Sequence, residues 1–226
     1  LIEADRIWHL ACPASPIHYQ SNPIKTAKTS FMGTLNMLGL AKRVQAKILL
    51  ASTSEVYGSS QFIPITEKHP LFAQSPYAAT KIASDQLALS YFNSFELPVL
   101  ILRPFNTFGP RQSLRAAIPT IITQLVSNKN KIKLGSLSPR RDFTYVSDTV
   151  DGFISAIGNK KCLGQTINLG TGKDFSIGET VKNIENILRK KAEVVTDNKR
   201  IRPKKSEVNR LISSNLKAKK LLNWSP

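Results

Sequence analysis

Apolar runs alternate along the first half of the chain with segments in which apolar residues recur at helical spacing. Three runs, at 6–11, 47–53 and 97–104, predict strands, and the last two are continuous, as expected for strands buried on both faces. The segments 26–43 and 77–95 lie between them and predict helices. This alternation of strand and helix predicts an α/β fold with a doubly wound parallel sheet.

The pattern changes after about residue 110, where the expected strands are short. Ser176 and Glu179 have the spacing of a capping box at the start of a helix. Val181, Ile184 and Leu188 then form an apolar stripe, which we interpret as core packing. The elements predicted in this half are strands at 131–134 and 165–169 and helices at 115–127, 147–157, 176–191 and 214–222.

The composition argues against several classes of protein. None of the apolar runs approaches the roughly 20 residues of a membrane-spanning helix, so we expect no membrane partner, and we find no signal peptide. The two cysteines, Cys12 and Cys162, stand in no C-x-x-C motif, and the three histidines are scattered. We therefore expect no metal site and a reducing, cytoplasmic setting.

The formal net charge of +17 is concentrated after residue 181. These basic residues are spread over helical periods, and no stacking-aromatic motif accompanies them. We therefore expect no nucleic acid and favour solvated Lys-rich helix faces, or attraction for a small anionic ligand.

A tyrosine and a lysine, Tyr77 and Lys81, stand four residues apart in the helix predicted at 77–95 and share one of its faces. A phenol with a pKa near 10 is a poor base at neutral pH, and a nearby ammonium group favours its ionised form. The Y-x-x-x-K pattern alone is weak, because it is common by chance.

Polar residues follow two of the predicted buried strands. Thr53, Ser54 and Glu55 come directly after the run at 47–53, and the segment 103–112 follows the run at 97–104. Ligands of open α/β sheets bind outside the carboxyl ends of the strands. These side chains and Tyr77 are therefore expected to converge at one edge of the sheet.

The motifs along the chain resemble those of the extended short-chain dehydrogenase/reductases that act on nucleotide sugars. The resemblance rests on "HLACPAS", "STSEVYG", "SPYAATK", "RPFNTFGPRQ" and "RRDFTYVSDTV", in this order, and covers nearly the whole chain. It implies a Rossmann-like domain whose remainder spans 1–110. Residues 111–226 would then be mainly a small substrate-binding lobe, with some segments returning to the first domain. The implied cofactor is NAD, the implied substrate is a nucleotide-diphosphate sugar, and a homodimer is expected by analogy.

The resemblance also implies roles for single residues, because they match the family's motif positions. The implied catalytic residues are Thr53, Ser54, Glu55, Tyr77 and Lys81. The implied cofactor-binding residues are Ala11, Cys12, Tyr77, Lys81 and Pro104. The implied substrate-binding residues are Asn106, Arg111, Arg141 and Arg202.

Several reactions share the first step, in which Tyr77 takes the proton of the sugar's 4-hydroxyl while C4 is oxidised. The 4-ketone can then be reduced on its other face, lose water across C5 and C6, or lose carbon dioxide if C6 is a carboxylate. Glu55 is suited to remove the C5 proton, which favours dehydration over epimerisation. The dTDP-glucose dehydratases have an Asp where this chain has Ser54, so Glu55 would act in turn as base and acid, or Ser54 would relay.

Two subfamilies share the resemblance. Segments before residue 59 are similar to UDP-glucuronate decarboxylases, and a longer part after it is similar to legionaminic-acid-type 4,6-dehydratases that act on nucleotide-linked N-acetylglucosamine. Dehydration of a substrate like UDP-N-acetylglucosamine is therefore favoured, and decarboxylation or 4-epimerisation is the alternative. An alternative of a different class is a non-catalytic nucleotide-binding relative or a basic RNA-binding relative.

The family's Gly-rich fingerprint for the cofactor pyrophosphate does not occur between Leu1 and Pro226. Roughly 70–80 residues are expected to precede this chain in the family, and the chain alone is expected to bind NAD poorly. Ser30 stands where the family usually has Asn.

Four smaller expectations concern the second half of the chain. Arg115 and Arg140 are expected at the surface, and Asp148 is expected to cap the helix at 147–157. The segment 168–176 is expected to be a strand-to-helix turn.

Overall fold

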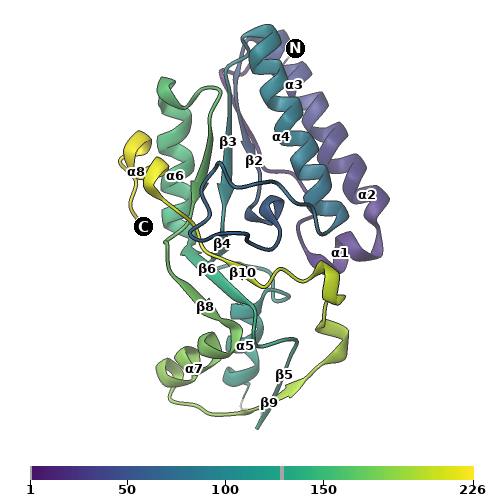
Figure 1. Ribbon diagram of the computed structural model, residues 1–226, viewed down its shortest axis with the longest axis vertical. Coiled ribbons are helices and arrows are strands. Elements are labelled where there is room, and N and C mark those ends of the chain that lie inside the picture. Colours follow the sequence, from purple (N-terminus) through teal and green to yellow (C-terminus); the bar gives the residue numbers. More distant parts are fainter. Residues whose placement is uncertain (1, 128–129) are drawn as a thin grey trace.

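The computed structural model describes residues 2–127 and 130–226 and is built on a four-stranded parallel sheet (Figure 1). The strand order is β1-β2-β3-β7, with all neighbouring pairs parallel. The bounds of these strands are Arg6–His9 for β1, Lys47–Ala51 for β2, Val99–Pro104 for β3 and Thr166–Leu169 for β7. The predicted parallel sheet is therefore confirmed.

Helices cover both faces of this sheet, because alternate residues of each strand point to opposite sides. Leu49 and Leu100 pack toward α6 (Val146–Gly158) and α8 (Leu216–Leu222), in a cluster that includes Trp224. Leu50 and Ile101 pack in a second cluster with residues of α3 (Gly33–Val44) and α4 (Pro76–Phe95). All four strand residues are fully buried, as the continuous apolar runs predict.

The helix expected at 26–43 is divided into three parts. They are α2 (Pro23–Ala27), a π-helical turn at Lys28–Met32, and α3. A shorter helix, α1 (Pro16–Ser21), precedes them and was not expected from the sequence. The π-helical turn buries Ser30, whose backbone carbonyl accepts from the hydroxyls of Thr34 at 2.7 Å and Ser84 at 3.1 Å. This contact ties the turn to α4, since Ser84 lies on that helix.

A smaller α/β region lies at the end of the molecule opposite the main sheet, at the bottom of Figure 1. A second sheet, in the order β10-β6-β4 with β8 antiparallel to β6, lies beside the carboxyl end of the main sheet. A two-stranded parallel sheet, β5-β9, lies beyond it. The bounds are Asn106–Phe108 for β4, Lys131–Leu134 for β5, Arg140–Tyr145 for β6, Asp174–Ser176 for β8, Glu193–Thr196 for β9, Arg210–Leu211 for β10, Ala117–Val126 for α5 and Ile177–Leu188 for α7.

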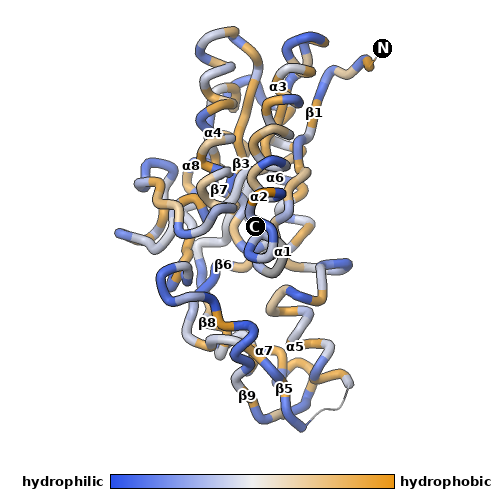
Figure 2. Tube along the Cα trace, turned by 90° about the vertical axis from the view of Figure 1, so that its right-hand side faces the viewer, coloured by the Kyte–Doolittle hydropathy of each residue, from blue (hydrophilic) through white to orange (hydrophobic). Residues whose placement is uncertain are grey.

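The β5–β9 end alternates between hydrophilic and hydrophobic segments (Figure 2). In β5, Lys131 and Lys133 are exposed while Ile132 and Leu134 are buried. The buried pair packs with Val181 of α7, and Ile184 and Leu188 pack against the same cluster. The apolar stripe predicted for α7 is therefore confirmed as core packing.

The capping box of α7 is also confirmed. The backbone N–H of Glu179 donates to Ser176 Oγ at 3.0 Å, and the backbone N–H of Ser176 donates to Glu179 Oε2 at 2.7 Å. The expected cap at Asp148 is wrong, because α6 begins two residues earlier and its N-cap is Tyr145. Asp148 lies in the first turn instead, where its carbonyl accepts from Trp224 Nε1 at 2.7 Å.

The segment 168–176 leads from a strand into α7, as predicted: its first two residues end β7, its last three form β8, and the turn lies between them. The carboxylate of Asp142 holds this turn by accepting from the backbone N–H groups of Thr171 at 2.8 Å and Gly172 at 2.9 Å. It also accepts from the backbone N–H of Ser213 at 3.0 Å, next to β10. In the part of the chain that the structure describes, no helix combines the length and the apolar character needed to cross a bilayer.

Candidate functional site

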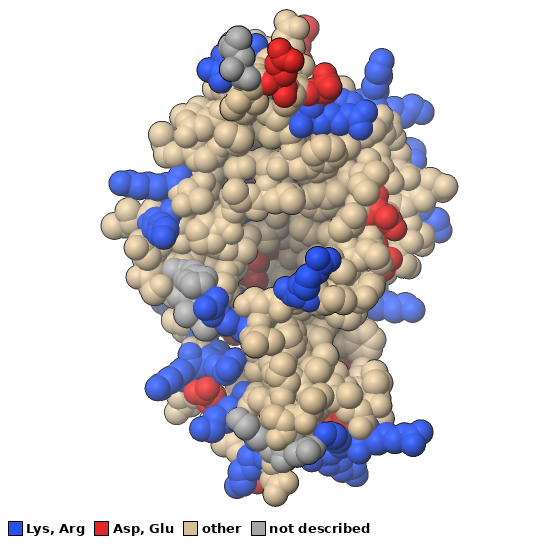
Figure 3. Space-filling view, turned by 180° about the vertical axis from the view of Figure 1, so that it is seen from behind, with Lys and Arg blue, Asp and Glu red and all other residues tan. Residues whose placement is uncertain are grey.

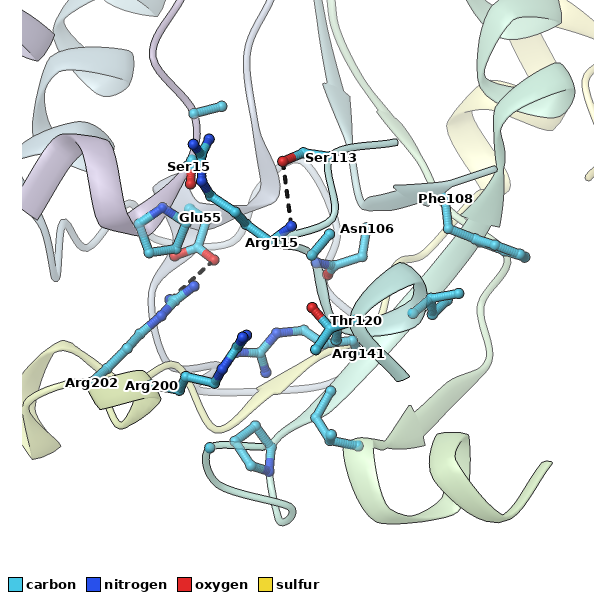
Figure 4. Close-up of a pocket in the computed structure, with 18 of the residues that line it drawn as sticks. Ser15, Glu55, Asn106, Phe108, Ser113, Arg115, Thr120, Arg141, Arg200 and Arg202 are labelled. Carbon is cyan, nitrogen blue, oxygen red and sulfur yellow. Dashed lines mark hydrogen bonds and ion pairs between the residues drawn. The ribbon is translucent and has the colours of Figure 1, made fainter. Parts of the chain in front are cut away.

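A cavity of about 580 Å³ opens where the carboxyl ends of β2 and β3 meet the smaller region. Its size is typical of sites for small-molecule ligands. It is lined from the main-sheet side by Thr53, Ser54, Glu55, Tyr77 and Pro104, and from the other side by Arg141, Arg200, Arg202 and Glu207, among others. Figure 4 shows the basic side chains of the second group facing Glu55.

The turn after β2 presents the first group of polar side chains. Thr53 is the N-cap of a 3₁₀-helix at Ser54–Tyr57, and its Oγ1 accepts from the backbone N–H of Glu55 at 3.2 Å. This local hydrogen bond holds the two side chains in a fixed relation. Thr53 and Ser54 are buried, whereas Glu55 is half-buried and can meet a ligand.

Tyr77 lies in the first turn of α4, whose N-cap Ser75 accepts from the backbone N–H of Ala78 at 3.1 Å. Its ring stacks on that of Tyr19, with centroids 5.2 Å apart and planes 6° from parallel. Burial raises the pKa of Tyr77, and a hydrogen bond from Thr53 acts in the opposite direction. Burial also raises the pKa of Tyr19, to about 12.

Lys81 lies one helical turn after Tyr77 and is only 3% exposed. Its Nζ donates to the backbone carbonyl of Ala51, at the end of β2, at 2.7 Å. Burial lowers the pKa of Lys81, because a charged ammonium group is poorly solvated there. Among the described residues, those that line the cavity include Tyr77 but not Lys81.

The residues predicted to bind the cofactor lie at the carboxyl ends of β1 and β3 and on α4. Cys12 Sγ and Ser30 Oγ form a hydrogen bond at 2.9 Å, and the thiol is close enough to act electrostatically on both Tyr77 and Lys81. Pro104 lines the cavity, whereas Ala11 is exposed and, like Cys12, is not part of the described lining.

Residues that line the cavity form two ion pairs with each other. Arg202 Nη1 lies 3.6 Å from Glu55 Oε1, and Arg141 Nη2 lies 3.1 Å from Glu207 Oε1. Burial opposes the charge of Arg202, but Glu55, Tyr19 and Glu207 together outweigh it and raise the pKa of that guanidinium. Burial lowers the pKa of Arg141, and the carboxylates of Glu55 and Glu207 offset part of the effect.

The other predicted substrate residues are divided between the cavity and the surface. Asn106 lines the cavity, and its buried Oδ1 accepts no hydrogen bond from the described residues. Arg111 is exposed, has a left-handed backbone conformation, and is absent from the lining formed by residues 2–127 and 130–226. The structure therefore brings Asn106, Arg141 and Arg202 together, but not Arg111.

Two expectations about arginines are corrected in part. Arg115 is exposed as expected, yet it lines the cavity, and Figure 4 shows it reaching toward the Glu55 side. Arg140 is only partly exposed, because its side chain pairs with Asp174 at 3.1 Å and with Glu179 at 2.9 Å. These contacts tie β6 to β8 and to the start of α7.

Several lining residues were not predicted at all. Tyr19 comes from α1, and Glu207 and Arg200 come from segments without strong periodicity. The two basic residues Arg200 and Arg202, spaced by one residue in "RIRP", are the signal that could have pointed to Arg200. Nothing in the local pattern around Tyr19 or Glu207 distinguishes them from surface polar residues.

On the face shown in Figure 3, basic side chains are scattered from one end to the other, and several gather near the β5–β9 end. Exposed residues of this kind include Lys131, Lys133, Lys182 and Arg189. Within residues 2–127 and 130–226, no group of three or more His, Cys, Asp or Glu side chains is arranged to hold a metal ion. The functional groups that line the cavity are carboxylates, phenols, hydroxyls and guanidinium groups.

Comparison with known proteins gives the relationships of the chain. The family model described as GDP-mannose 4,6 dehydratase matches residues 1–226. UDP-glucuronic acid decarboxylase 1 of Arabidopsis thaliana is 39% identical over 234 residues, which cover 100% of this chain and 52% of that relative. The chain thus spans about half the length of this curated relative.

Solved structures share the fold. The X-ray structure of Pal from Bacillus thuringiensis superposes with a TM-score of 0.90 at 31% identity, covering 100% of this chain and 72% of that one. UDP-glucuronic acid 4-epimerase from Bacillus cereus, in complex with UDP-glucuronic acid and NAD, gives a TM-score of 0.89 at 29% identity, covering 98% and 70%. The resemblance inferred from the motifs is confirmed: the chain belongs to the GDP-mannose 4,6 dehydratase family, within the extended short-chain dehydrogenase/reductases.

Proposed function

We propose that the full-length protein is an NAD-dependent enzyme that oxidises a nucleotide-linked hexose at C4 and then eliminates water across C5 and C6. The observation that carries this proposal is the presence of Glu55 in one cavity with Tyr77 and Thr53. A carboxylate beside the oxidised sugar is suited to remove the C5 proton, which the 4-ketone makes acidic. The favoured substrate is similar to UDP-N-acetylglucosamine.

Tyr77 would take the proton of the 4-hydroxyl, and Thr53 would hold that hydroxyl by a hydrogen bond. Burial raises the pKa of Tyr77, so the phenol needs a nearby positive charge to act as a base. Lys81 would supply this charge from one turn further along α4. The stacked ring of Tyr19 keeps water from one face of Tyr77.

Because Glu55 is paired with Arg202, binding of the substrate by Arg202 would also affect Glu55. A bound diphosphate would attract Arg202 and Arg141, because guanidinium groups bind phosphate oxygens through two parallel hydrogen bonds. Glu55 would then be released in part from its ion pair with Arg202. Ser54 would relay a proton if Glu55 does not act alone as both base and acid.

The residues present fit the nicotinamide end of NAD. The thiol of Cys12 is close to Tyr77 and Lys81, and Tyr77 and Pro104 line the cavity. These four residues and Ala11 would hold that end of the cofactor. Bound NAD would supply the hydride acceptor for C4.

The decisive experiment identifies the product of the full-length protein. We expect UDP-N-acetylglucosamine, incubated with NAD and the protein, to give a product that has lost one water by mass spectrometry. An unchanged mass with inverted C4 would indicate epimerisation and contradict the proposal. An inactive protein that binds the nucleotide sugar would favour a non-catalytic relative.

Decarboxylation of UDP-glucuronate is the second candidate. It is favoured by the 39% identity to a UDP-glucuronic acid decarboxylase. Incubation of UDP-glucuronate with the full-length protein would release carbon dioxide if this candidate is correct. Comparison of the two substrates at equal concentration separates the candidates.

Three further proposals concern the domain division, the oligomeric state and the location of the protein. We propose that residues 1–110 form the remainder of the cofactor domain and that 111–226 are mainly the substrate lobe, supported by the separate sheets on the two sides of the cavity. We also propose a cytoplasmic homodimer. Light scattering on the full-length protein tests the dimer, and fractionation of cells tests the location.

A further inference from the structure

A buried ion pair lies below the site and has no part in the mechanism proposed above. Asp85 of α4 is fully buried, and its Oδ2 accepts from Arg103 Nε at 3.0 Å, from Arg103 Nη2 at 2.9 Å and from Ser52 Oγ at 2.8 Å. Its other oxygen, Oδ1, is also buried and accepts no hydrogen bond from the described residues. A buried polar atom without a partner is rare and needs an explanation.

The pair is joined to a chain of hydrogen bonds that runs through Tyr57 and Asn168. Arg103 Nη1 donates to Tyr57 Oη at 2.9 Å, and Tyr57 donates to Asn168 Oδ1 at 2.7 Å. Asn168 lies on β7 and also donates to the carbonyl of Ile65 at 3.1 Å. All three donors to Asp85 are therefore directed at Oδ2, and this network gives Oδ1 no partner.

Lys81 is the cation closest in sequence to Asp85, one helical turn away on the same buried face of α4. Its Nζ has three donors but makes one described hydrogen bond, to Ala51. Burial lowers the pKa of Lys81, while Cys12 and Asp85 oppose this effect. His9 of β1 is also close enough to Lys81 for the two charges to interact. Tyr77 is the titratable group one turn before Lys81 on α4.

We propose that Asp85 is a positioning residue, whose unpaired Oδ1 keeps the buried Lys81 side chain protonated below Tyr77. The catalytic consequence rests on the proposed function, since Lys81 can favour the Tyr77 phenolate only while it carries a charge. Among the described residues Oδ1 has no hydrogen-bond donor, and although Arg103 is paired with Oδ2, the carboxylate still acts on Lys81, one turn away on the same buried face, in a medium of low polarity. Asp85 itself does not touch the cavity lining described above.

The first test measures the pH dependence of the free energy of unfolding in urea, using the full-length protein. The folded pKa of Lys81 lies below its unfolded value, so the unfolded chain holds more protons between the two values, and stability rises with pH across this window. Asp85→Asn removes the attraction and is expected to move the onset of this rise to lower pH, by about one unit or more. Lys81→Met is expected to abolish the shift, since the titrating group is gone.

Asp85→Asn leaves Arg103 buried without its carboxylate and can prevent folding. The double variant Asp85→Asn with Arg103→Met avoids this, because replacing a whole buried pair is often tolerated. It is expected to move the onset in the same direction. Ser52→Ala removes one hydrogen bond to Asp85 but no charge, and is expected to leave the onset in place. An unchanged onset in the double variant, or an equal shift with Ser52→Ala, would overturn the proposal.

The second test measures turnover against pH. We expect the alkaline decline of kcat to begin about one pH unit lower in the double variant, with KM for the sugar unchanged, because a neutral Lys81 no longer supports the phenolate. A uniform loss of kcat at all pH values would indicate a structural role and contradict the proposal. If the protein converts no nucleotide sugar in any form, the proposed function fails, and the unfolding experiment still decides the role of Asp85.

Discussion

Two helices of this protein, α4 and α7, each bury one face, but the side chains on the two buried faces are of different types. The buried residues of α4 include Tyr77, Lys81, Ser84 and Asp85, at helical spacing. In α7 the side that packs on β5 and β9 carries the apolar stripe that begins with Val181. Both stripes obey the same 3.6-residue period, so the period shows which face is inside and the residue types show what that face does.

The difference has an energetic cost. An apolar face stabilises the fold directly when it is removed from water, whereas a buried polar face needs hydrogen-bond or ionic partners to offset its lost hydration. In α4 these partners come from distant strands, as with Ala51 for Lys81 and Arg103 for Asp85. The polar face therefore depends on the correct assembly of the whole sheet, while α7 needs only its local cap and its neighbours.

The largest expected effect is on the polar face of α4. Tyr77→Phe removes the hydroxyl that takes the 4-hydroxyl proton and is expected to lower turnover of the full-length protein by about 100-fold to 10,000-fold. Initial rates of product formation measure it. The matched control is Tyr91→Phe on the same helix, whose ring packs edge-on against Phe95. If Tyr91→Phe lost as much activity as Tyr77→Phe, the loss would come from any Tyr-to-Phe change on α4 and not from the Tyr77 hydroxyl.

The next effect concerns the carboxylate in the cavity. Glu55→Gln keeps the shape but removes the base, so elimination is expected to slow by about 100-fold while oxidation at C4 continues. Rapid-mixing absorbance at the NADH band would then show reduced cofactor that persists. Glu193→Gln is the control, because Glu193 also forms an ion pair, with Lys131, but is exposed. Normal elimination by Glu55→Gln would transfer the role of base to another group.

The sequence predicted well those features that are local to one segment. The strands β2 and β3 are continuous apolar runs, and the capping box of α7 is contained within four residues. Thr53, Glu55 and Tyr77 were expected to converge because the carboxyl ends of parallel strands share an edge, and they line one cavity.

Features held together by distant partners were not predicted. The strand β6, "RRDFTY", has little apolar pattern, and its register depends on Asp142 and on pairing with β4, β8 and β10. Tyr19 reaches the cavity only because α1 packs its ring on Tyr77. The pattern within a single segment does not predict such contacts, since they form only when distant segments pack together.

Smaller effects are expected on the apolar face of α7. Val181→Ala leaves a small cavity among Ile121, Leu125 and Ile132, and is expected to lower the free energy of unfolding by about 2 kcal/mol. Urea unfolding measures it, and kcat is expected to stay within about twofold of the parent once the protein is folded. Ile187→Ala on the same helix is the control, because Ile187 is 79% exposed and its loss is expected to cost less than about 0.5 kcal/mol.

The smallest effect concerns the start of α7. Ser176→Ala removes the side-chain oxygen that accepts from the backbone N–H of Glu179, and is expected to cost about 1 kcal/mol of stability. Ser94→Ala, at an exposed position near the end of α4, is the control and is expected to change nothing measurable. The amides at the start of α7 should exchange with deuterium faster in Ser176→Ala, while those of α4 should keep their rates. Equal acceleration in both helices would mean that α7 is not held by its own cap, and that the two helices depend on the assembled protein to the same degree.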